Sequence, residues 1–131
     1  MNHAQQTYKI LLVEDNELNQ KFAIAVIRKL GYEMDIASNG LIGVQLFKEN
    51  TYDLILMDIQ MPEMNGIEAT QAIRQLEASE GSGKHVPIIA VTAFAMEQDK
   101  RNCMEAGMDD FIAKPYKPFE LEQKIKQFFQ L

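Results

Sequence analysis

The sequence predicts a three-layer α/β sandwich in which five parallel strands, in the order 2-1-3-4-5, carry five helices on their two faces. Two observations lead to this prediction. Apolar runs such as residues 10–13 and 54–57 lack the alternation of a half-solvated strand, so they indicate strands covered on both faces. Strand-like and helix-like segments alternate strictly, and helical crossovers between strands produce a parallel sheet with few possible topologies.

Each element follows from a local pattern. Strands are expected at 8–13, 32–37, 52–58, 87–91 and 110–113, with Asp53 as a polar residue at the entry to the third, and residues 32–37 alternate as an exposed edge strand does. Helices are expected at 16–30, 41–50 and 67–77. A fourth helix follows the fourth strand and ends near residue 106, and a fifth is marked by Leu121, Ile125 and Phe128. Gly31 and Gly107 are typical helix terminators. Residues 79–84 are expected to form a flexible polar loop.

Composition limits the function classes. A chain of 131 residues with 47% hydrophobic content predicts one domain, residues 8–131, after a short N-terminal tail, residues 1–7. A net charge of -6 argues against direct nucleic-acid binding. The sequence has neither a long apolar run nor a signal-peptide pattern, so we expect a cytoplasmic protein without membrane contact. The single cysteine, Cys103, excludes an internal disulfide and is expected to face the core.

Reactive side chains follow the strands at the edge where ligands bind in such sheets. Glu14 and Asp15 follow the first strand, Asp58 ends the third, and Thr92 and Lys114 end the fourth and fifth. The predicted strand order brings these residues together. Three neighbouring carboxylates either bind protons or hold a divalent cation, and an all-oxygen set favours Mg²⁺ or Mn²⁺. Since Mg²⁺ usually keeps positions for other oxygens, a phosphate-bearing substrate fits this site.

One reaction uses all these residue types. An aspartate can accept a phosphoryl group as an acyl phosphate, with a metal ion and an ammonium neutralising the charge and a hydroxyl within reach. Taken singly, each residue has a simpler explanation. A strand-end acid often caps a helix or lies in solvent, Thr92 would serve as a helix cap, and Lys114 as a solvated lysine.

Four blocks of sequence, residues 10–16, 53–62, 88–93 and 106–115, resemble those of a response-regulator receiver domain, the chemotaxis-regulator-like phosphoacceptor of two-component signalling. The resemblance implies that Asp58 is phosphorylated, that Glu14, Asp15 and Asp58 hold Mg²⁺ (or Mn²⁺) with the backbone carbonyl of Gln60, and that Lys114 pairs with the phosphoryl group. It also implies that Thr92 and Phe111 form a conformational switch. Such a domain is a signalling phosphoacceptor that assists its own phosphorylation and dephosphorylation, rather than an enzyme with a separate substrate.

The motifs further resemble receivers attached to hybrid histidine kinases, with Asn19-Gln20 in the first helix among the matching residues. This resemblance implies a histidine kinase as phosphodonor, a histidine phosphotransfer domain as acceptor, or both. It also implies a signalling surface, and a possible homodimer contact, on the fourth helix, fifth strand and fifth helix. Whether the chain is a free-standing regulator or a piece of a larger kinase stays open.

Some positions depart from the family pattern. Asn65 replaces the usual Asp at a helix-opening turn, where either residue serves. Phe94 lies beside the path of attacking water in this family, and its bulk is expected to slow autodephosphorylation. Three other functions are less favoured. A flavodoxin-like electron carrier is disfavoured by the acids at 14, 15 and 17, which repel a cofactor phosphate, and an aspartyl phosphatase is disfavoured because Gln60 stands where a general acid belongs. A pure docking module does not account for the presence of Asp15, Asp58, Thr92 and Lys114 together.

Overall fold

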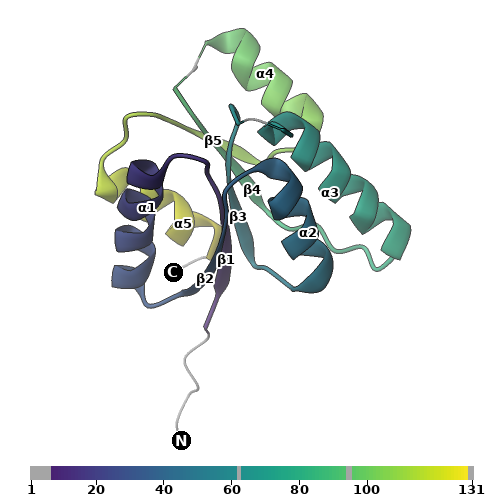
Figure 1. The fold of residues 1–131 in the computed structure, drawn as a ribbon, viewed down its shortest axis with the longest axis horizontal. Helices are drawn as coiled ribbons and strands as arrows, with labels where there is room; N and C mark the ends of the chain where they lie inside the picture. Colours follow the sequence, from purple (N-terminus) through teal and green to yellow (C-terminus); the bar gives the residue numbers. More distant parts are fainter. Residues whose placement is uncertain (1–6, 62, 94–95, 130–131) are drawn as a thin grey trace, which may run out of the picture.

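The computed structural model describes residues 7–61, 63–93 and 96–129, and it confirms the predicted three-layer architecture (Figure 1). Five parallel strands form one sheet in the order β2-β1-β3-β4-β5. Their bounds are β1 (Lys9–Val13), β2 (Glu33–Ala37), β3 (Leu54–Asp58), β4 (Ile88–Thr92) and β5 (Asp110–Ala113). The predicted N-terminal tail lies outside the described residues except for Thr7, which is exposed and outside any strand.

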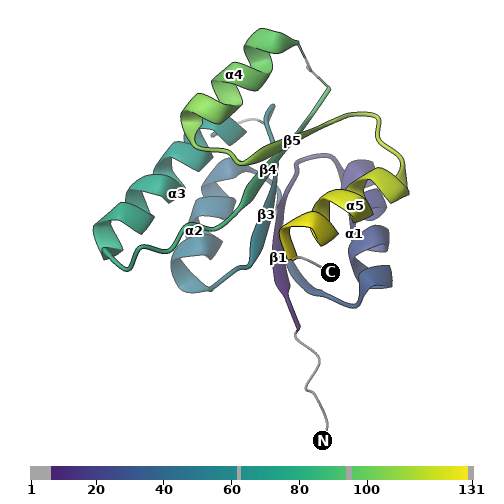
Figure 2. The same cartoon turned by 180° about the vertical axis from the view of Figure 1, so that it is seen from behind.

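Five helices cover the sheet on both faces (Figures 1 and 2). One face carries α1 (Glu17–Leu30) and α5 (Pro118–Phe129); the other carries α2 (Gly40–Glu49), α3 (Gly66–Glu80) and α4 (Glu97–Ala106). In the part of the chain that the structure describes, no helix combines the length and the apolar character needed to cross a membrane.

The core is two-sided because alternate residues of each buried strand point to opposite faces. Leu54 and Leu56 join the cluster beneath α1 and α5, whereas Ile55 and Met57 join the cluster beneath α2 and α3. All five residues of β3 are buried, which confirms that this strand is covered on both sides. Cys103 is buried on α4, as predicted.

The strand register brings the carboxyl ends of the central strands together. Val13, the last residue of β1, pairs with Met57, and Asp58 pairs with Val91 of β4. Thr92 at the end of β4 pairs with Ala113 of β5, directly before Lys114. The segments after β1, β3, β4 and β5 therefore leave the same edge of the sheet.

Most helix ends follow the predicted signals. The side chain of Asn16 caps α1, and Gly31 ends it in the left-handed conformation (φ 82°). Asn65 caps α3 and forms a capping box with Glu68, in agreement with the expectation that Asn serves there as well as Asp. Helix α4 begins only at Glu97, with Met96 at its N-cap, so Thr92 does not cap this helix.

The carboxyl end of α3 was predicted wrongly. Helix α3 continues through Glu80 and ends at Gly81, whereas the pattern of apolar residues predicted an end near Glu77 and a loop that included residues 79 and 80. Tertiary contacts explain the extension, because the buried Glu77 accepts hydrogen bonds from Arg74 and from the backbone N–H of Val86. These bonds fix the last turns of the helix against the following loop.

We expect Thr70→Val to raise the free energy of unfolding by about 1 kcal/mol. Thr70 is fully buried on α3, and its hydroxyl has no hydrogen-bond partner among the described residues. Valine has the same shape and similar helix propensity without the unsatisfied hydroxyl. Urea denaturation of wild type, Thr70→Val and the cavity-forming control Thr70→Ala measures the effect; a destabilised valine variant would mean that the hydroxyl has a partner.

Candidate functional site

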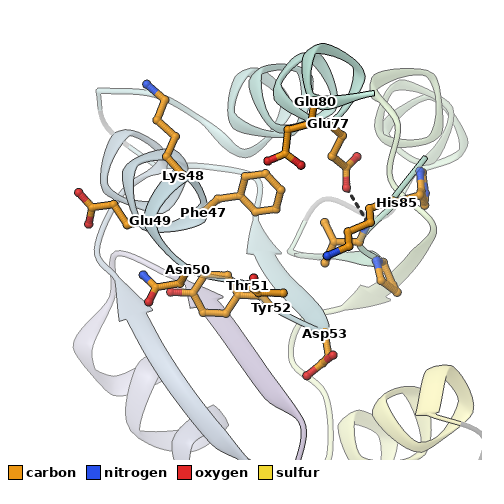
Figure 3. A pocket seen from close by; sticks show the side chains of 13 residues that line it. Phe47, Lys48, Glu49, Asn50, Thr51, Tyr52, Asp53, Glu77, Glu80 and His85 are labelled. Atoms are coloured by element: carbon orange, nitrogen blue, oxygen red, sulfur yellow. Dashed lines mark hydrogen bonds between the residues drawn. The ribbon is translucent and has the colours of Figure 1, made fainter. Parts of the chain in front are cut away.

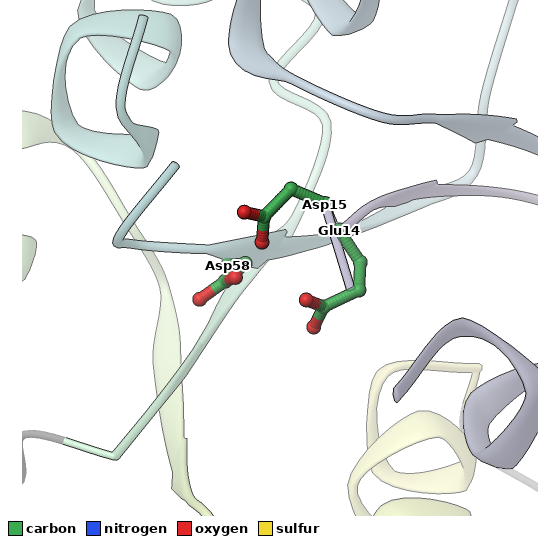
Figure 4. Close-up of side chains that lie close together, drawn as sticks. All are labelled: Glu14, Asp15 and Asp58. Carbon is green, nitrogen blue, oxygen red and sulfur yellow. The ribbon is translucent and has the colours of Figure 1, made fainter. Parts of the chain in front are cut away.

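Three carboxylates converge where β1 and β3 end (Figure 4). Glu14 and Asp15 directly follow β1, and Asp58 is the last residue of β3. Each offers one oxygen atom, and these atoms lie within 4.8 Å of one another. Glu14 and Asp58 are buried, at 4% and 6% exposure, whereas Asp15 is exposed. Two of the three charges are thus shielded from water.

Lys114 lies between the two buried carboxylates. Its Nζ is 3.0 Å from Oε1 of Glu14 and 3.5 Å from Oδ1 of Asp58. The backbone N–H of Lys114 donates to the carbonyl of Thr92, which ties this residue to the end of β4. The side chain of Lys114 is therefore a paired group of the site and not a solvated lysine.

The surroundings of Asp58 oppose its ionisation. Burial and the nearby Glu14 charge raise the pKa of Asp58 to about 7, although Lys114 and the backbone N–H of Gln60 oppose this shift. One ammonium cannot neutralise two buried carboxylates and the exposed Asp15 beside them. The site therefore favours the addition of a further positive charge, either a proton or a metal cation.

The predicted residues share one hollow of about 200 Å³. The structure brings together Glu14, Asp15, Asp58, Gln60, Thr92 and Lys114 around it. Phe111 does not line this hollow; it is partly buried on β5 and packs at the margin of the core. Phe94 lies outside the described residues, so its effect on dephosphorylation stays a prediction.

Two residues of α1 also serve this site. Asn19 lines the hollow, and Nε2 of Gln20 donates to the backbone carbonyl of Glu14 over 2.7 Å. In the sequence, both residues contribute to the family resemblance, but neither was predicted to belong to the site. The available signal was their position in the first turn of a helix that directly follows the two acids.

A larger hollow of about 720 Å³ lies at the opposite ends of the strands (Figure 3). The carboxyl ends of α2 and α3 border it, with Phe47 and Tyr52 among its lining side chains. Its buried acid, Glu77, is already bonded to Arg74 and Val86. The convergence of acid, hydroxyl and ammonium belongs to the smaller hollow around Asp58.

The donor set around Asp58 suits Mg²⁺. Hard divalent cations prefer oxygen ligands, and Mg²⁺ in particular is bound through one or two carboxylates while it keeps other positions for water or phosphate oxygens. Glu14, Asp15 and Asp58 provide carboxylate oxygens at compatible positions. The residues present therefore fit a divalent metal ion that keeps coordination positions for other oxygen ligands.

The comparison with protein families agrees with this geometry. The family model of the response regulator receiver domain matches residues 10–126. The chain belongs to the response-regulator receiver family. Receiver domains of this family act in two-component signalling, and the sheet order and the five helices are those of its members.

Curated relatives include receivers within large kinases and free-standing ones. The chain is 47% identical to "Hybrid signal transduction histidine kinase I" of Dictyostelium discoideum over 122 residues, which cover 89% of this chain but 7% of that kinase. It is 40% identical to the "Polar-differentiation response regulator DivK" of Brucella anthropi, over 91% of this chain and 94% of that protein. The chain thus spans a small part of the kinase but nearly all of the free-standing regulator.

Solved structures give the same fold. The receiver domain of the sensor histidine kinase PA1611 from Pseudomonas aeruginosa, which has a magnesium ion coordinated in its active-site cleft, matches with a TM-score of 0.85 and 40% identity over 96% of this chain and 100% of that one. The receiver domain of Ssk1 from Saccharomyces cerevisiae, solved in complex with the histidine phosphotransfer protein Ypd1, matches with a TM-score of 0.85 and 34% identity, over 93% and 88% of the two chains.

Proposed function

We propose that this receiver domain, residues 8–131, takes a phosphoryl group from a phosphohistidine onto Asp58 and reports the modification through its conformation. An oxygen of the Asp58 carboxylate attacks phosphorus, the phosphorus–nitrogen bond breaks, and the histidine leaves with the electron pair and regains a proton. The observation that supports this most is a buried aspartate that faces an ammonium and two further carboxylates within one hollow. A histidine kinase is the proposed donor, and the cytoplasm is the proposed location.

Each residue has a defined part in the transfer. Glu14, Asp15, Asp58 and the carbonyl of Gln60 would hold Mg²⁺, which when bound supplies neutralisation of the phosphoryl charge. Lys114, now shared between Glu14 and Asp58, would pair with the new phosphoryl oxygens. The Thr92 hydroxyl, at the same hollow, would bond to one of them. We propose that Phe111 follows the movement of Thr92, so that the change reaches α4, β5 and α5.

Intact-mass measurement tests the acceptor. After incubation with Mg²⁺ and a small phosphoryl donor such as acetyl phosphate, the wild-type chain should gain the mass of one phosphoryl group, and Asp58→Asn should gain none. Asp53→Asn is the matched control, because Asp53 directly precedes β3, at the end of the strand remote from Asp58, and accepts a hydrogen bond from the backbone N–H of Lys9. Equal labelling of wild type and Asp58→Asn would refute Asp58 as the acceptor.

We further propose that a histidine phosphotransfer protein docks on α1, beside the site. An apolar hollow of about 660 Å³ lies there, bordered by Leu18, Phe22 and Tyr116. Asn19, Ala93 and Lys114 line both this hollow and the one around Asp58, so the two adjoin. A partner whose histidine reaches Asp58 must also cover the neighbouring surface, and Leu18 is 75% exposed there.

We expect Leu18→Asp to weaken binding of a phosphotransfer protein about tenfold or more, because a buried leucine contributes roughly 2 kcal/mol and the new charge would be desolvated. Ypd1 is the probe, and isothermal titration measures the dissociation constant. Met104→Asp is the control, since Met104 is also exposed but lies on α4. A loss confined to Met104→Asp would move the proposed docking surface to α4.

A second surface would report the phosphorylated state. Phe119 on α5 is 65% exposed and borders a hollow of about 460 Å³ with Lys100 of α4 and Phe111 of β5. We propose that partners, a second copy of the chain among them, bind this α4–β5–α5 surface. Phosphorylation-dependent change in sedimentation, lost in Phe119→Ser, would support a homodimer.

A further inference from the structure

The ring of Phe111 is in contact with a cation. Nζ of Lys100, on α4, lies 5.6 Å from the centroid of this ring. An ammonium at such a distance is attracted to the aromatic ring. Phe111 is partly buried at the margin of the core, so its ring can face both the interior and the α4 side. The contact joins α4 to the strand that carries the proposed switch residue.

Lys100 is exposed, and none of the ion pairs formed within residues 7–61, 63–93 and 96–129 involves it. Helix α4 itself has few anchors, because its buried residues are Cys103 and Ala106. The backbone N–H of its N-cap residue, Met96, donates to the Asp99 carboxylate, but the Met96 side chain makes no capping hydrogen bond. Because α4 has few anchoring interactions, the contact of Lys100 with the Phe111 ring of β5 helps to determine the position of this helix.

We propose that Lys100 is a positioning residue, which holds the Phe111 ring in its unphosphorylated placement and so makes the domain harder to switch. The inference rests on the proposed function, because it requires the ring to move when Asp58 is loaded. A ring that moves inward leaves Lys100, so the contact stabilises the unloaded state alone. By linkage, the same contact must weaken the binding of any ligand that favours the loaded state.

Beryllofluoride with Mg²⁺ is the probe, since it mimics a phosphoryl group on a carboxylate. Lys100→Gln should bind it roughly two- to fivefold more tightly than wild type, the change expected for an exposed contact of this kind. Lys100→Arg keeps the cation and should bind as wild type does. Arg101→Gln removes the same charge from the next position of α4, where the guanidinium donates to Gln98, and it controls for net charge near the site.

A double-mutant cycle separates a contact with the ring from other effects. In the Phe111→Leu background, Lys100→Gln should leave the beryllofluoride affinity unchanged. In the otherwise wild-type chain, Lys100→Gln should shift the aromatic proton resonances of Phe111 in NMR spectra. Equal tightening by Lys100→Gln and Arg101→Gln would overturn the positioning role in favour of simple charge. Identical binding by all variants would overturn it too, whereas a wild type that binds no beryllofluoride would overturn the proposed function as well.

Discussion

In metal-free buffer at about pH 8, Asp58→Asn should have a free energy of unfolding about 2 kcal/mol higher than that of the wild-type chain. Burial and Glu14 raise the pKa of Asp58 to about 7 in the folded chain, against roughly 3.9 when unfolded. The folded state therefore binds the proton more tightly than the unfolded state does. Stability from this group is complete below about pH 4 and is lost as the pH rises to about 7.

The upper bound on this loss is about 4 kcal/mol, and movement of Lys114 and water toward the ionised carboxylate will reduce it. Urea denaturation between about pH 5 and pH 8 with a chelator present measures the effect. The stability difference between variant and wild type should grow with pH. A difference that does not change with pH would contradict the proton linkage.

Magnesium should reverse the order of stability, so that the wild-type chain becomes more stable than Asp58→Asn. A cation bound to Glu14, Asp15 and Asp58 stabilises the folded chain in proportion to the logarithm of its concentration, and it offsets the same repulsion that raises the pKa of Asp58. We expect millimolar Mg²⁺ to raise the unfolding temperature of wild type by several degrees and to have little effect on Asp58→Asn. Thermal scans at fixed pH give this comparison directly.

The architecture could be predicted because its signals are local. Unbroken apolar runs marked β1, β3 and β4 as strands covered on both faces, and strict alternation with helices left one favoured strand order. That order alone brought Glu14, Asp58, Thr92 and Lys114 to one edge. The strand order, and with it the group of residues at this edge, could thus be predicted from short-range patterns and from the limited number of ways to connect parallel strands.

The sequence did not predict features that depend on contacts between distant segments. From the sequence, Glu14 and Asp15 were predicted to have equivalent positions. In the structure Glu14 is buried against Lys114, one hundred residues away, and Asp15 is exposed. Asn19 and Gln20 were not predicted to belong to the site, because their contribution depends on the direction of α1 relative to the end of β1. The end of α3 was predicted one turn early, since the bonds of Glu77 involve residues beyond the helix.

The same limitation hid a connection between α3 and the segment before β5. Arg74 of α3 donates from Nε to the carbonyl of Gly107, from Nη1 to Glu77 and from Nη2 to Asp109. Asp109 in turn accepts from the backbone N–H of Ile88, at the start of β4. One guanidinium thus joins a helix to the connection between α4 and β5 and, through Asp109, to the first residue of β4.

We expect Arg74→Met to lower the free energy of unfolding by about 3 kcal/mol, because the buried Glu77 carboxylate loses its cation and the Gly107 carbonyl loses its donor. Arg74→Lys should recover only part, since an ammonium cannot reproduce a fork that serves three acceptors. Urea denaturation at neutral pH measures each variant. Arg101→Met is the control, expected to cost less than about 0.5 kcal/mol because that side chain is exposed and, among the described residues, bonds to Gln98.

Combining Arg74→Met with Glu77→Gln tests the cause. If the cost comes from an uncompensated buried charge, neutralising Glu77 should recover about 1 kcal/mol or more, a non-additive result. Glutamine can still accept the hydrogen bond from Val86, so the last turns of α3 keep that anchor. Strictly additive losses would instead mean that Arg74 acts through Gly107 and Asp109. The stability of the α3–β5 connection would then reside in the segment before β5 rather than in the helix.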